Sequence, residues 1–415
     1  MRVVVLGAGI LGVSSAWYLH RAGHEVVVVD RQPAPAMETS LANGGQRSTG
    51  HVEPWASPDT LPRLLWWMTQ ENAPMLFRLR ADPAQWRWAL SFLSECRPSR
   101  QRHNLRRLLN LGLYSRQAQD ELQATLPLPH EEIRQGILHL YDDPKEWEDA
   151  CRTSVRITQL GYERRRVTLQ EAMALEPALQ YSSTHWVGGT YTPGDCTGNA
   201  HIWTQSLAQH CERAGIRFLF EQVAESLITE GNRVCAVRLS GQPLPLDADA
   251  VVVALGSHSG PFLKHLGLRL PIYPVKGYSA TMSVLKQEHV PVISITDDAS
   301  KMVFTLLESK LRVAGTAELN GYDMTLSAVR CNALTERARI LFPEAADYAH
   351  PEYWTGLRPA TPSGCPLIGR WQYRNLFLNT GHGSLGWTLG CGSGKALALL
   401  VSGEPTGLDF SFSMP

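Results

Sequence analysis

A chain of 415 residues is longer than the ~250–300 residues that one hydrophobic core organises, so we expect two domains. With 44% apolar and 19% charged residues, the composition is typical of a folded globular protein, not of a disordered or collagenous chain. Lys plus Arg number 39, as do Asp plus Glu, so no net positive charge attracts a polyanion. We therefore expect no nucleic acid partner.

The start of the chain carries no recognisable targeting signal. Arg2 is followed at once by the apolar run Val3–Leu6, without the charged segment and cleavage site of a secretory leader. The eight cysteines contain no Cys-x-x-Cys pair and no regular spacing, so we expect free thiols and no metal site. No window reaches the ~18–20 uninterrupted apolar residues of a membrane-spanning helix. These observations predict a cytoplasmic protein whose membrane contact, if it has one, is peripheral.

The first thirty residues predict a strand, a tight turn, a helix and a second strand. Arg2–Leu6 is a Val-rich strand, Gly7–Gly12 reads G-x-G-x-x-G, and Val13–Arg21 has helical spacing. A second strand, Glu25–Val29, ends at Asp30, an acid 18 residues beyond the last glycine of the motif. A glycine motif between a strand and a helix, followed by an acid at this distance, indicates a dinucleotide site.

Each residue of this fingerprint has a physical role. Gly7 permits the turn, Gly9 lets the main chain approach a pyrophosphate, and Gly12 allows the helix to pack closely on the strand. The free N–H groups at the helix start face the phosphates, and Asp30 holds the adenosine ribose. The fingerprint alone leaves both NAD and FAD as cofactors.

The rest of the chain predicts a discontinuous nucleotide domain. Residues 59–125 are expected to form helices, and strands are expected at 216–220, 224–229, 234–239 and 248–255. Strand patterns at 272–283, 291–296, 301–307 and 310–316 follow without intervening helices, which favours an antiparallel sheet, and a helix is expected over 328–341. We assign 1–58, 150–260 and 350–415 to the nucleotide domain, and 59–149 and 261–349 to a substrate domain with a helical insertion.

Several sequence blocks resemble a known family. Glu38–Gln46 follows the fingerprint, and the other blocks are Gly188-Gly189, Pro193–Gly198, Tyr273–Tyr278, Trp354–Pro359 and Asn379–Thr388. Together they resemble the FAD-dependent D-amino-acid oxidase superfamily, and within it the small subunit of bacterial D-amino-acid dehydrogenase. The resemblance covers the whole chain. It implies an α/β fold of the D-amino-acid oxidase/glycine oxidase type, with a Rossmann-like FAD-binding domain and an antiparallel-sheet substrate domain.

The resemblance also implies the cofactor and its contacts. It favours FAD, with oxidation of a D-amino acid to an imino acid that hydrolyses to a 2-oxo acid and ammonia. The positive end of a helix beginning near Trp387 would stabilise the negative charge of reduced flavin. The expected cofactor-binding residues are Gly7, Gly9, Ile10, Leu11, Gly12, Asp30, Arg31, Ser40, Asn43, Gly44, Gly45, Gln46, Val223, Ala254, Gly256, Gly381, His382, Gly383, Ser384, Leu385, Gly386, Trp387 and Thr388.

Three side chains are expected at the substrate. Arg358 is assigned to the substrate carboxylate, because a guanidinium offers a planar bidentate fit and the resemblance places this residue there. Tyr278 and His51 complete the expected catalytic set, and Tyr273 is an alternative to Tyr278 because only one of the two is expected to face the pocket. His51 stands where the resemblance suggests Tyr, and Ser363 stands where it suggests Asp. These two departures leave the identity of the substrate open.

The segment 64–107 indicates a membrane contact or an ordinary helical surface. It contains Trp66, Trp67, Trp86 and Trp88, and its last eleven residues contain five arginines and no acid. Aromatic and basic helices suit the surface of an anionic membrane such as the inner face of the plasma membrane, where a quinone would accept the electrons. Buried tryptophans beside a solvated basic face are the alternative. The sequence also leaves four questions open. These are whether oxygen is the electron acceptor, whether the protein has partner subunits, whether its substrate is a cyclic D-amino acid, and whether it is instead a non-catalytic subunit that holds flavin.

Overall fold

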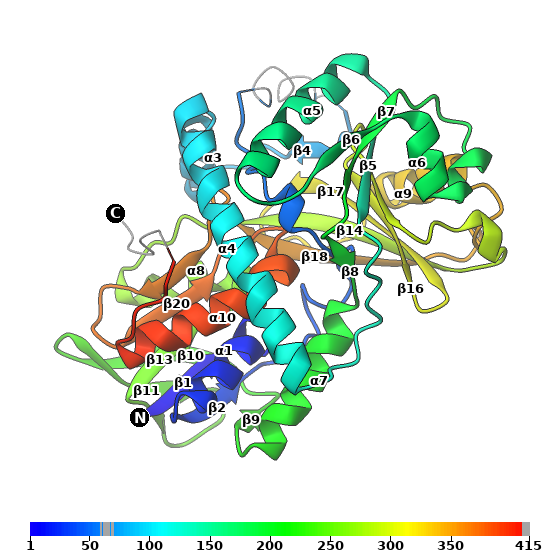
Figure 1. Ribbon diagram of the computed structural model, residues 1–415. Helices are drawn as coiled ribbons and strands as arrows, with labels where there is room; N and C mark the ends of the chain where they lie inside the picture. The colour runs from blue at the N-terminus through cyan, green and yellow to red at the C-terminus, as the bar shows by residue number, and fades with distance from the viewer. Residues whose placement is uncertain (59, 61–66, 68–69, 409–415) are drawn as a thin grey trace.

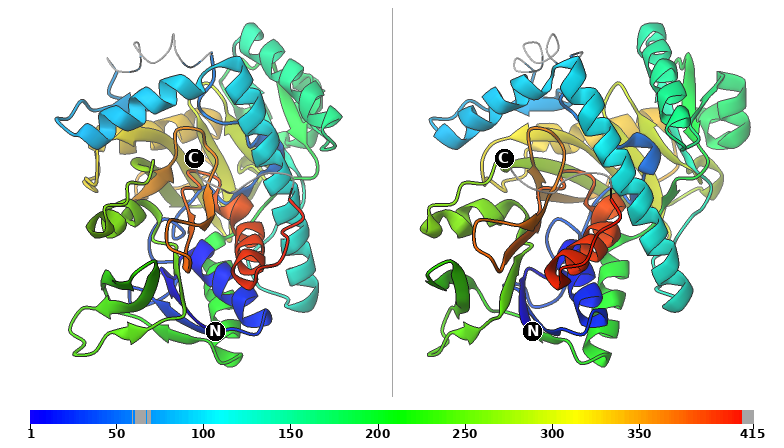
Figure 2. Two further views of the ribbon diagram at one scale, coloured as in Figure 1. Left: turned by 90° about the vertical axis from the view of Figure 1, so that its left-hand side faces the viewer. Right: turned by 60° about the vertical axis from the view of Figure 1, so that its left-hand side comes forward.

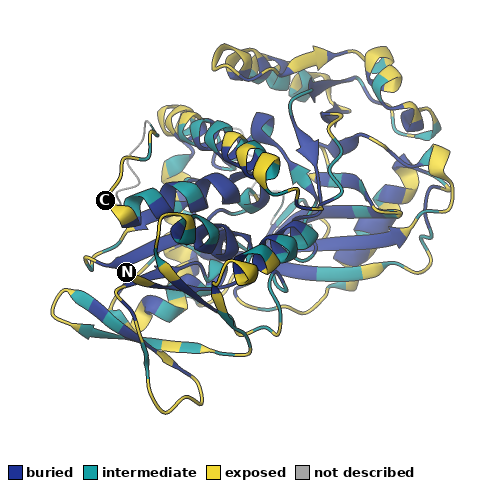
Figure 3. Ribbon diagram, turned by 60° about the horizontal axis from the view of Figure 1, so that its bottom comes forward, coloured by how far each residue is buried: buried dark blue, intermediate teal, exposed yellow. Residues whose placement is uncertain are grey.

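The computed structural model describes residues 1–58, 60, 67 and 70–408. In this part of the chain two main sheets form two bodies, joined by long helices (Figure 1). The strands of both sheets are largely buried, whereas exposed residues gather on the outer helices and hairpin loops (Figure 3). None of the helices in these ranges is both long and apolar enough to cross a bilayer.

The first body contains a six-stranded sheet. Its order is β19 (Leu367–Arg370), β20 (Leu376–Thr380), β13 (Ala250–Val253), β1 (Arg2–Leu6), β2 (Glu25–Val29) and β9 (Arg217–Leu219). All neighbouring pairs are parallel except β19 with β20. The valine runs form its centre because a parallel sheet is covered on both faces.

Different layers cover the two faces of this sheet. On one face, Val3 and Val5 pack with α1 (Ile10–Arg21), α4 (Pro98–Thr125), α7 (Ala200–Arg213) and α10 (Gly386–Ser402). On the other face, Val4 and Leu6 pack with the small antiparallel sheet of β10 (Ala224–Glu230), β11 (Arg233–Leu239) and β12 (Leu246–Asp247), and with α8 (Ser259–Leu263). This arrangement places the glycine turn after β1 at the carboxyl edge of the sheet, where α/β proteins bind nucleotides.

The second body contains a nine-stranded sheet. Its path is β18 (Glu352–Ala360), β14 (Tyr273–Ser283), β17 (Lys310–Leu319), β16 (Met302–Leu307), β15 (Ser294–Asp297), β5 (Ile137–Tyr141), β7 (Gly188–Thr192) and β6 (Arg165–Val167), and β4 (Met75–Phe77) pairs with β17. Helix α9 (Ala328–Leu341) covers one face, and α5 (Pro144–Gln159) and α6 (Leu169–Leu175) lie near β6 and β7. A two-stranded ribbon of β3 (Gln46–Arg47) and β8 (Cys196–Thr197) lies nearby.

Two helices connect the bodies. Helix α3 (Pro83–Glu95) packs Trp88 and Phe92 against β14 and β17, and α4 follows it after two residues. Helix α4 runs from the nine-stranded sheet past α10 toward α7 (Figure 2). Both helices begin with Pro at the first position, where the missing N–H has no acceptor inside the helix.

The predicted helices and strands agree with the structure better than the predicted domain boundaries do. The helix over 328–341 is confirmed, and each of the four strands expected between 272 and 316 is present. The assignment of all of 150–260 to the nucleotide domain is wrong, because β6 and β7 extend the nine-stranded sheet. The same holds for β18, which lies within 350–415 and pairs with β14. The sequence of a short strand does not indicate which distant strand it will pair with.

Candidate active site

A cavity of about 1120 Å³ lies between the two bodies. The carboxyl ends of β1, β2 and β13 form one end, and β14, β17, β16 and β18 form the wall opposite. All the expected cofactor-binding residues line it except Gly12 and Gly381. The cavity therefore collects segments from the whole length of the chain.

The glycine turn after β1 is required by close main-chain contacts. A Cβ on Gly7 would lie 2.6 Å from the carbonyl oxygen of Ala254, and φ of Gly7 is 104°. A Cβ on Gly12 would lie 1.7 Å from the carbonyl oxygen of Gly7, so Gly12 supports the turn from below without lining the cavity. The Ser40 hydroxyl accepts a hydrogen bond from the N–H of Ile10, the first residue of α1, at 3.3 Å. The remaining N–H groups of the first helical turn suit a phosphate.

Asp30 lies at the end of β2, where an acid can hold a ribose. Its carboxylate accepts hydrogen bonds from the N–H groups of Ala8 at 2.5 Å and Gln32 at 2.8 Å. These bonds fix the carboxylate beside the glycine turn, and each oxygen keeps a lone pair for a ligand. Burial raises the pKa of Asp30, while the two backbone donors oppose that shift.

Replacing Asp30 by alanine is expected to weaken retention of the nucleotide cofactor by about 1–3 kcal/mol, the usual worth of hydrogen bonds to a charged group. Equilibrium dialysis of the cofactor against wild type and Asp30→Ala measures this difference. Glu25→Ala is the control, because Glu25 lies on the same strand but its side chain is exposed and pairs with Arg2. Equal retention by all three proteins would place the ribose elsewhere.

The segment from Asn43 to Gln46 is a main-chain surface for a flat ligand. The side chain of Asn43 accepts from the N–H of Gly45, and φ of Gly45 is 72°. The Gln46 amide donates to the hydroxyls of Ser294 and Thr296 on β15. The Asn43 side chain thus fixes the turn inside the segment, and the Gln46 side chain holds the segment against the nine-stranded sheet. The main-chain groups of this segment are therefore the ones that would meet a flat ligand.

The glycine-rich segment before α10 closes the cavity from the other side. Gly381 and Gly383 have φ of 81° and 54°, and the N–H of Gly383 donates to the Pro359 carbonyl at 2.9 Å. Helix α10 begins at Gly386 without a side-chain cap, so its first N–H groups lack an acceptor within the helix. Burial lowers the pKa of His382 to about 3, so this ring is neutral at physiological pH. An electron-rich carbonyl fits this helix start.

Arg358 is the cationic group that faces the cavity from β18. Its guanidinium donates to the Thr316 carbonyl at 2.7 Å, and among the described residues it forms no ion pair. Burial and the nearby Arg330 lower the pKa of Arg358 to about 10, so the group stays charged at neutral pH. A half-buried cation that lines a cavity without an anionic partner favours an anionic ligand. The assignment of Arg358 to the substrate carboxylate stays a prediction.

Gly277 on β14 provides the space for this guanidinium. A Cβ on Gly277 would lie 2.4 Å from Cζ of Arg358, so the planar group lies directly over the glycine. The Trp354 ring covers Gly356 in the same way and lines the cavity beside Arg358. The main chain beside Arg358 is also fixed, because the Leu357 carbonyl accepts from the hydroxyls of Thr39 and Ser257.

Replacing Gly277 by alanine is expected to displace the guanidinium of Arg358 and to raise the Kd of a small carboxylate by about tenfold or more, since misplacement by about 1 Å weakens such contacts strongly. The content of bound nucleotide cofactor should stay at the wild-type level. Calorimetric titration with the carboxylate, and chromatography of the released cofactor, measure the two quantities. Gly260→Ala is the matched control, because a Cβ there meets no atom within 4 Å. A Kd equal to wild type would show that the site tolerates a methyl group beneath the guanidinium.

Tyr278 is not a substrate contact, and this prediction is wrong. Its side chain packs with Cys331 and Leu334 of α9, on the face of the sheet opposite the cavity, and its hydroxyl donates to Glu318 at 2.6 Å. Tyr273 is no substitute, because its hydroxyl donates to Asp82. Tyr278 lines the cavity, but its hydroxyl is used by Glu318.

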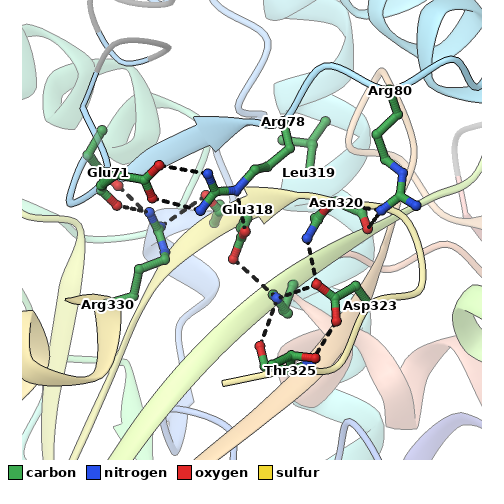
Figure 4. Close-up of polar contacts among 12 residues, drawn as sticks. Glu71, Arg78, Arg80, Glu318, Leu319, Asn320, Asp323, Thr325 and Arg330 are labelled. Carbon is green, nitrogen blue, oxygen red and sulfur yellow. Dashed lines mark hydrogen bonds and ion pairs between the residues drawn. The ribbon is translucent and has the colours of Figure 1, made fainter. Parts of the chain in front are cut away.

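The face behind β14 holds an ionic network around the buried pair of Lys276 and Glu318 (Figure 4). Lys276 donates to the Thr325 carbonyl at 3.0 Å and lies 3.3 Å from the Glu318 carboxylate. Glu318 also accepts from Arg78, which pairs with Glu71. The network fixes β14 and β17 on the face of the sheet opposite Arg358. Its carboxylates pair with Lys276 and Arg78, and not with Arg358.

His51 lies at the cavity wall, stacked on a second histidine. Its ring is parallel to that of His139 on β5, with centroids 3.3 Å apart and an interplanar angle of 7°. Burial, the Arg164 guanidinium and the Lys301 ammonium hold the pKa of both rings well below the usual value. The pair is therefore a neutral polar wall. Sequence reasoning missed His139, because no motif links residues so far apart in the chain.

Asp195 is a structural residue of this site. Its buried carboxylate accepts hydrogen bonds from the Ser48 and Tyr162 hydroxyls and from the N–H groups of Thr49 and Gly50. It thus fixes the segment that carries His51. Burial raises the pKa of Asp195 to about 6, and the four donors oppose that shift.

The chain belongs to the DAO family of FAD dependent oxidoreductases, whose family model matches residues 2–400. The cofactor is therefore FAD, and the cavity suits it. Gly7 and Gly12 leave a turn that no side chain could occupy, and two helix starts offer free N–H groups at separate ends of the cavity. The dinucleotide would be held by the turn after β1 and by Asp30, and the flavin by 43–46 and the start of α10. FAD supplies the hydride acceptor for the reaction.

Curated relatives match the chain over its whole length. It is 48% identical over 415 residues to "D-amino acid dehydrogenase" of Dechloromonas aromatica (strain RCB), covering 99% of both chains. It is 46% identical to a protein of the same name from Paramagnetospirillum magneticum, covering 98% of this chain and 96% of that one.

Two solved structures show the shared fold. A glycine oxidase from Geobacillus kaustophilus gives a TM-score of 0.74 at 21% identity, covering 98% of this chain and 96% of that one. The iminodiacetate oxidase of Chelativorans sp. BNC1 gives 0.72 at 22% identity, with 99% and 97% coverage. The predicted fold class, a FAD-binding α/β domain with a substrate sheet of the glycine oxidase type, is confirmed.

Proposed function

We propose that this flavoprotein is a D-amino acid dehydrogenase that converts D-amino acids to 2-oxo acids and ammonia. The proposal rests on the position of Arg358, a half-buried cation that lines the cavity and pairs with no described carboxylate. The full-length relatives named D-amino acid dehydrogenase support the substrate class. The presence of Arg358 also favours catalysis over a role as a flavin-holding subunit.

The residues of the chain orient the substrate more than they move protons. Arg358 would bind the α-carboxylate, and the Trp354 ring beside it would contact the side chain. The substrate loses a hydride from its α carbon and a proton from its nitrogen, and water then converts the imino acid to the 2-oxo acid and ammonia. A protonated amine cannot release the hydride, so the neutral amine is the reactive form. His51 and His139 keep this wall uncharged.

Reduction of the bound flavin without oxygen tests the substrate class. The purified protein is mixed with single D- and L-amino acids in an anaerobic cuvette, and the loss of flavin absorbance is followed. Bleaching by several D-amino acids and not by their L-enantiomers is the expected result. Bleaching by glycine or by L-amino acids alone would contradict the proposal. This test separates substrate choice from acceptor choice.

We further propose that the protein docks on an anionic membrane, at the inner face of the plasma membrane, and passes electrons to a quinone. Helix α3 exposes Trp86, Leu90 and Leu93 by 47%, 65% and 45%, and their spacing of four and three residues places them on one face. Arg97 and Arg100 are exposed just beyond it. An apolar helix face beside arginines suits an anionic bilayer. Trp88 belongs to the core instead, Trp67 lines the cavity, and Trp66 lies outside the described residues.

Replacing Trp86, Leu90 and Leu93 together by serine is expected to release the protein from anionic vesicles. Sedimentation with vesicles of anionic lipid at low salt measures the bound fraction, which should also fall with added salt. Leu244→Ser is the matched control, because Leu244 is 78% exposed on the β11–β12 loop. Equal binding to neutral and anionic vesicles, or no effect of the triple variant, would contradict membrane docking. Rapid turnover with oxygen alone would contradict the quinone.

A further inference from the structure

Strand β17 contains an irregularity directly beside Arg358. Three residues of β14, from Lys276 to Tyr278, span the same length as four residues of β17, from Gly315 to Glu318. Strand β17 therefore has a β-bulge at this point. Within it, Thr316 has a φ of 56°, in the left-handed region. This conformation is strongly disfavoured for a β-branched residue, so something in the structure must maintain it.

The bulge lies where β17 changes its partner. Strand β16 pairs with β17 as far as Gly315, and β4 pairs with it from Ala317 onward. Thr316 is the residue between these two ladders. Its carbonyl is therefore not needed for strand pairing, and it accepts the hydrogen bond from Nη1 of Arg358 at 2.7 Å. An extended residue would instead direct its carbonyl along the plane of the sheet.

The side chain of Thr316 has no comparable contact. Its Oγ1 is buried and has no hydrogen-bond partner in the described part of the chain. The hydroxyl therefore does not explain why Thr316 keeps a strained backbone. The main-chain carbonyl is the part of the residue that contacts a site residue.

We propose that Thr316 is a positioning residue whose left-handed backbone directs its carbonyl at Arg358 and fixes the guanidinium for the substrate carboxylate. This inference deepens the proposed function and rests on its assignment of Arg358. Gly277 lies opposite the bulge and makes room for the same guanidinium. The bulge and the glycine are thus two features of adjacent strands that serve one side chain.

Three variants separate the backbone of Thr316 from its side chain. Thr316→Gly adopts positive φ without strain, so it should keep KM within about threefold of wild type and raise Tm by a few degrees. Thr316→Val lacks the hydroxyl and should also keep KM. Deletion of Thr316 removes the extra residue of the bulge, and it should raise KM for D-amino acids by about tenfold or more with FAD still bound.

The deletion is repeated in an Arg358→Lys background. Because Thr316 acts through the guanidinium, the deletion should add less than about twofold to the loss in that background. A residue needed only for general stability would lower activity equally in both backgrounds. Flavin absorbance and Tm report whether each variant is folded.

Several results would overturn the inference. An unchanged KM in the folded deletion variant would do so, as would full additivity with Arg358→Lys. If the deletion variant does not retain FAD, the two substitutions of Thr316 decide. A tenfold higher KM in either Thr316→Gly or Thr316→Val assigns the role to the side chain and overturns the proposal. An unchanged KM in both variants, together with a higher Tm for Thr316→Gly, supports the proposal. If Arg358→Lys itself leaves KM and kcat unchanged, the proposed function fails instead.

Discussion

Arg358→Lys is expected to lower kcat/KM for D-amino acids by about 100-fold while FAD stays bound. Lysine keeps the positive charge but cannot form the planar pair of hydrogen bonds to a carboxylate, nor reach the Thr316 carbonyl in the same geometry. The loss of one charge-assisted bond and of orientation corresponds to about 2–3 kcal/mol. Steady-state kinetics with a good D-amino acid substrate, at a pH where its amine is neutral, measures the effect.

Arg312→Lys is the matched control for this prediction. Arg312 is also a half-buried arginine of the nine-stranded sheet, but its guanidinium donates to Thr281 and it does not line the cavity. Its kinetics should match wild type within about twofold. Titration with a simple carboxylate that perturbs the flavin spectrum is a second measurement of the carboxylate site. Arg358→Lys should weaken binding of this carboxylate as it lowers kcat/KM. Wild-type kinetics in Arg358→Lys would remove the carboxylate site from this residue.

Asp195→Ala is expected to destabilise the protein by about 3–5 kcal/mol, because it leaves several buried donors without an acceptor. These donors come from Ser48, Thr49, Gly50 and Tyr162, so the loss affects both the segment that carries His51 and the chain that follows α5. Denaturant unfolding followed by tryptophan fluorescence, or the thermal midpoint of the holoprotein, measures the change.

Asp195→Asn should recover little of this stability, because its amide NH₂ would face a donor where the carboxylate has an acceptor. The pH dependence adds a second test. The pKa of Asp195 is raised in the folded protein, so the folded state binds the proton of this carboxyl group more tightly than the unfolded state does. The stability that comes from this protonation is fully present below the unfolded pKa and is lost as pH rises through about 6. The wild type should lose that contribution between about pH 4 and 6, and Asp195→Asn should not. Equal stability of all three proteins would show that water replaces the carboxylate.

The nucleotide end of the fold could be predicted from the sequence because its signals are local. The turn, the valine strands and Asp30 lie within thirty residues, and Gly7 and Gly12 stand where the close main-chain contacts of the turn leave no room for a Cβ. Arg358 was also predictable, but only through the resemblance of its sequence block. Nothing in the pattern of β18 itself distinguishes a cavity-facing arginine from an ion-paired one.

The substrate end could not be predicted to the same depth, because its geometry depends on pairing between distant strands. Alternation along β14 allows Tyr278 to be inward or outward, and only its packing against α9 decides. The bulge at Thr316 is invisible in the sequence, since threonine is typical of a regular strand. His51 and His139 meet only after β5 joins the sheet, so their neutral stacked pair is a product of tertiary structure.

The crossing of α4 and α10 has a consequence for how the two bodies can move. Gly392 lies so close to α4 that a Cβ on it would be 2.5 Å from the Cα of Ser115, whose hydroxyl accepts from the N–H of Gly392. The same helix donates from Arg116 to Tyr162, which packs in the same core as both helices. Because this crossing lies inside the core of the first body, an opening between the two bodies would leave it intact. We therefore expect α4, α10 and Tyr162 to keep their contacts while ligands enter and leave the cavity.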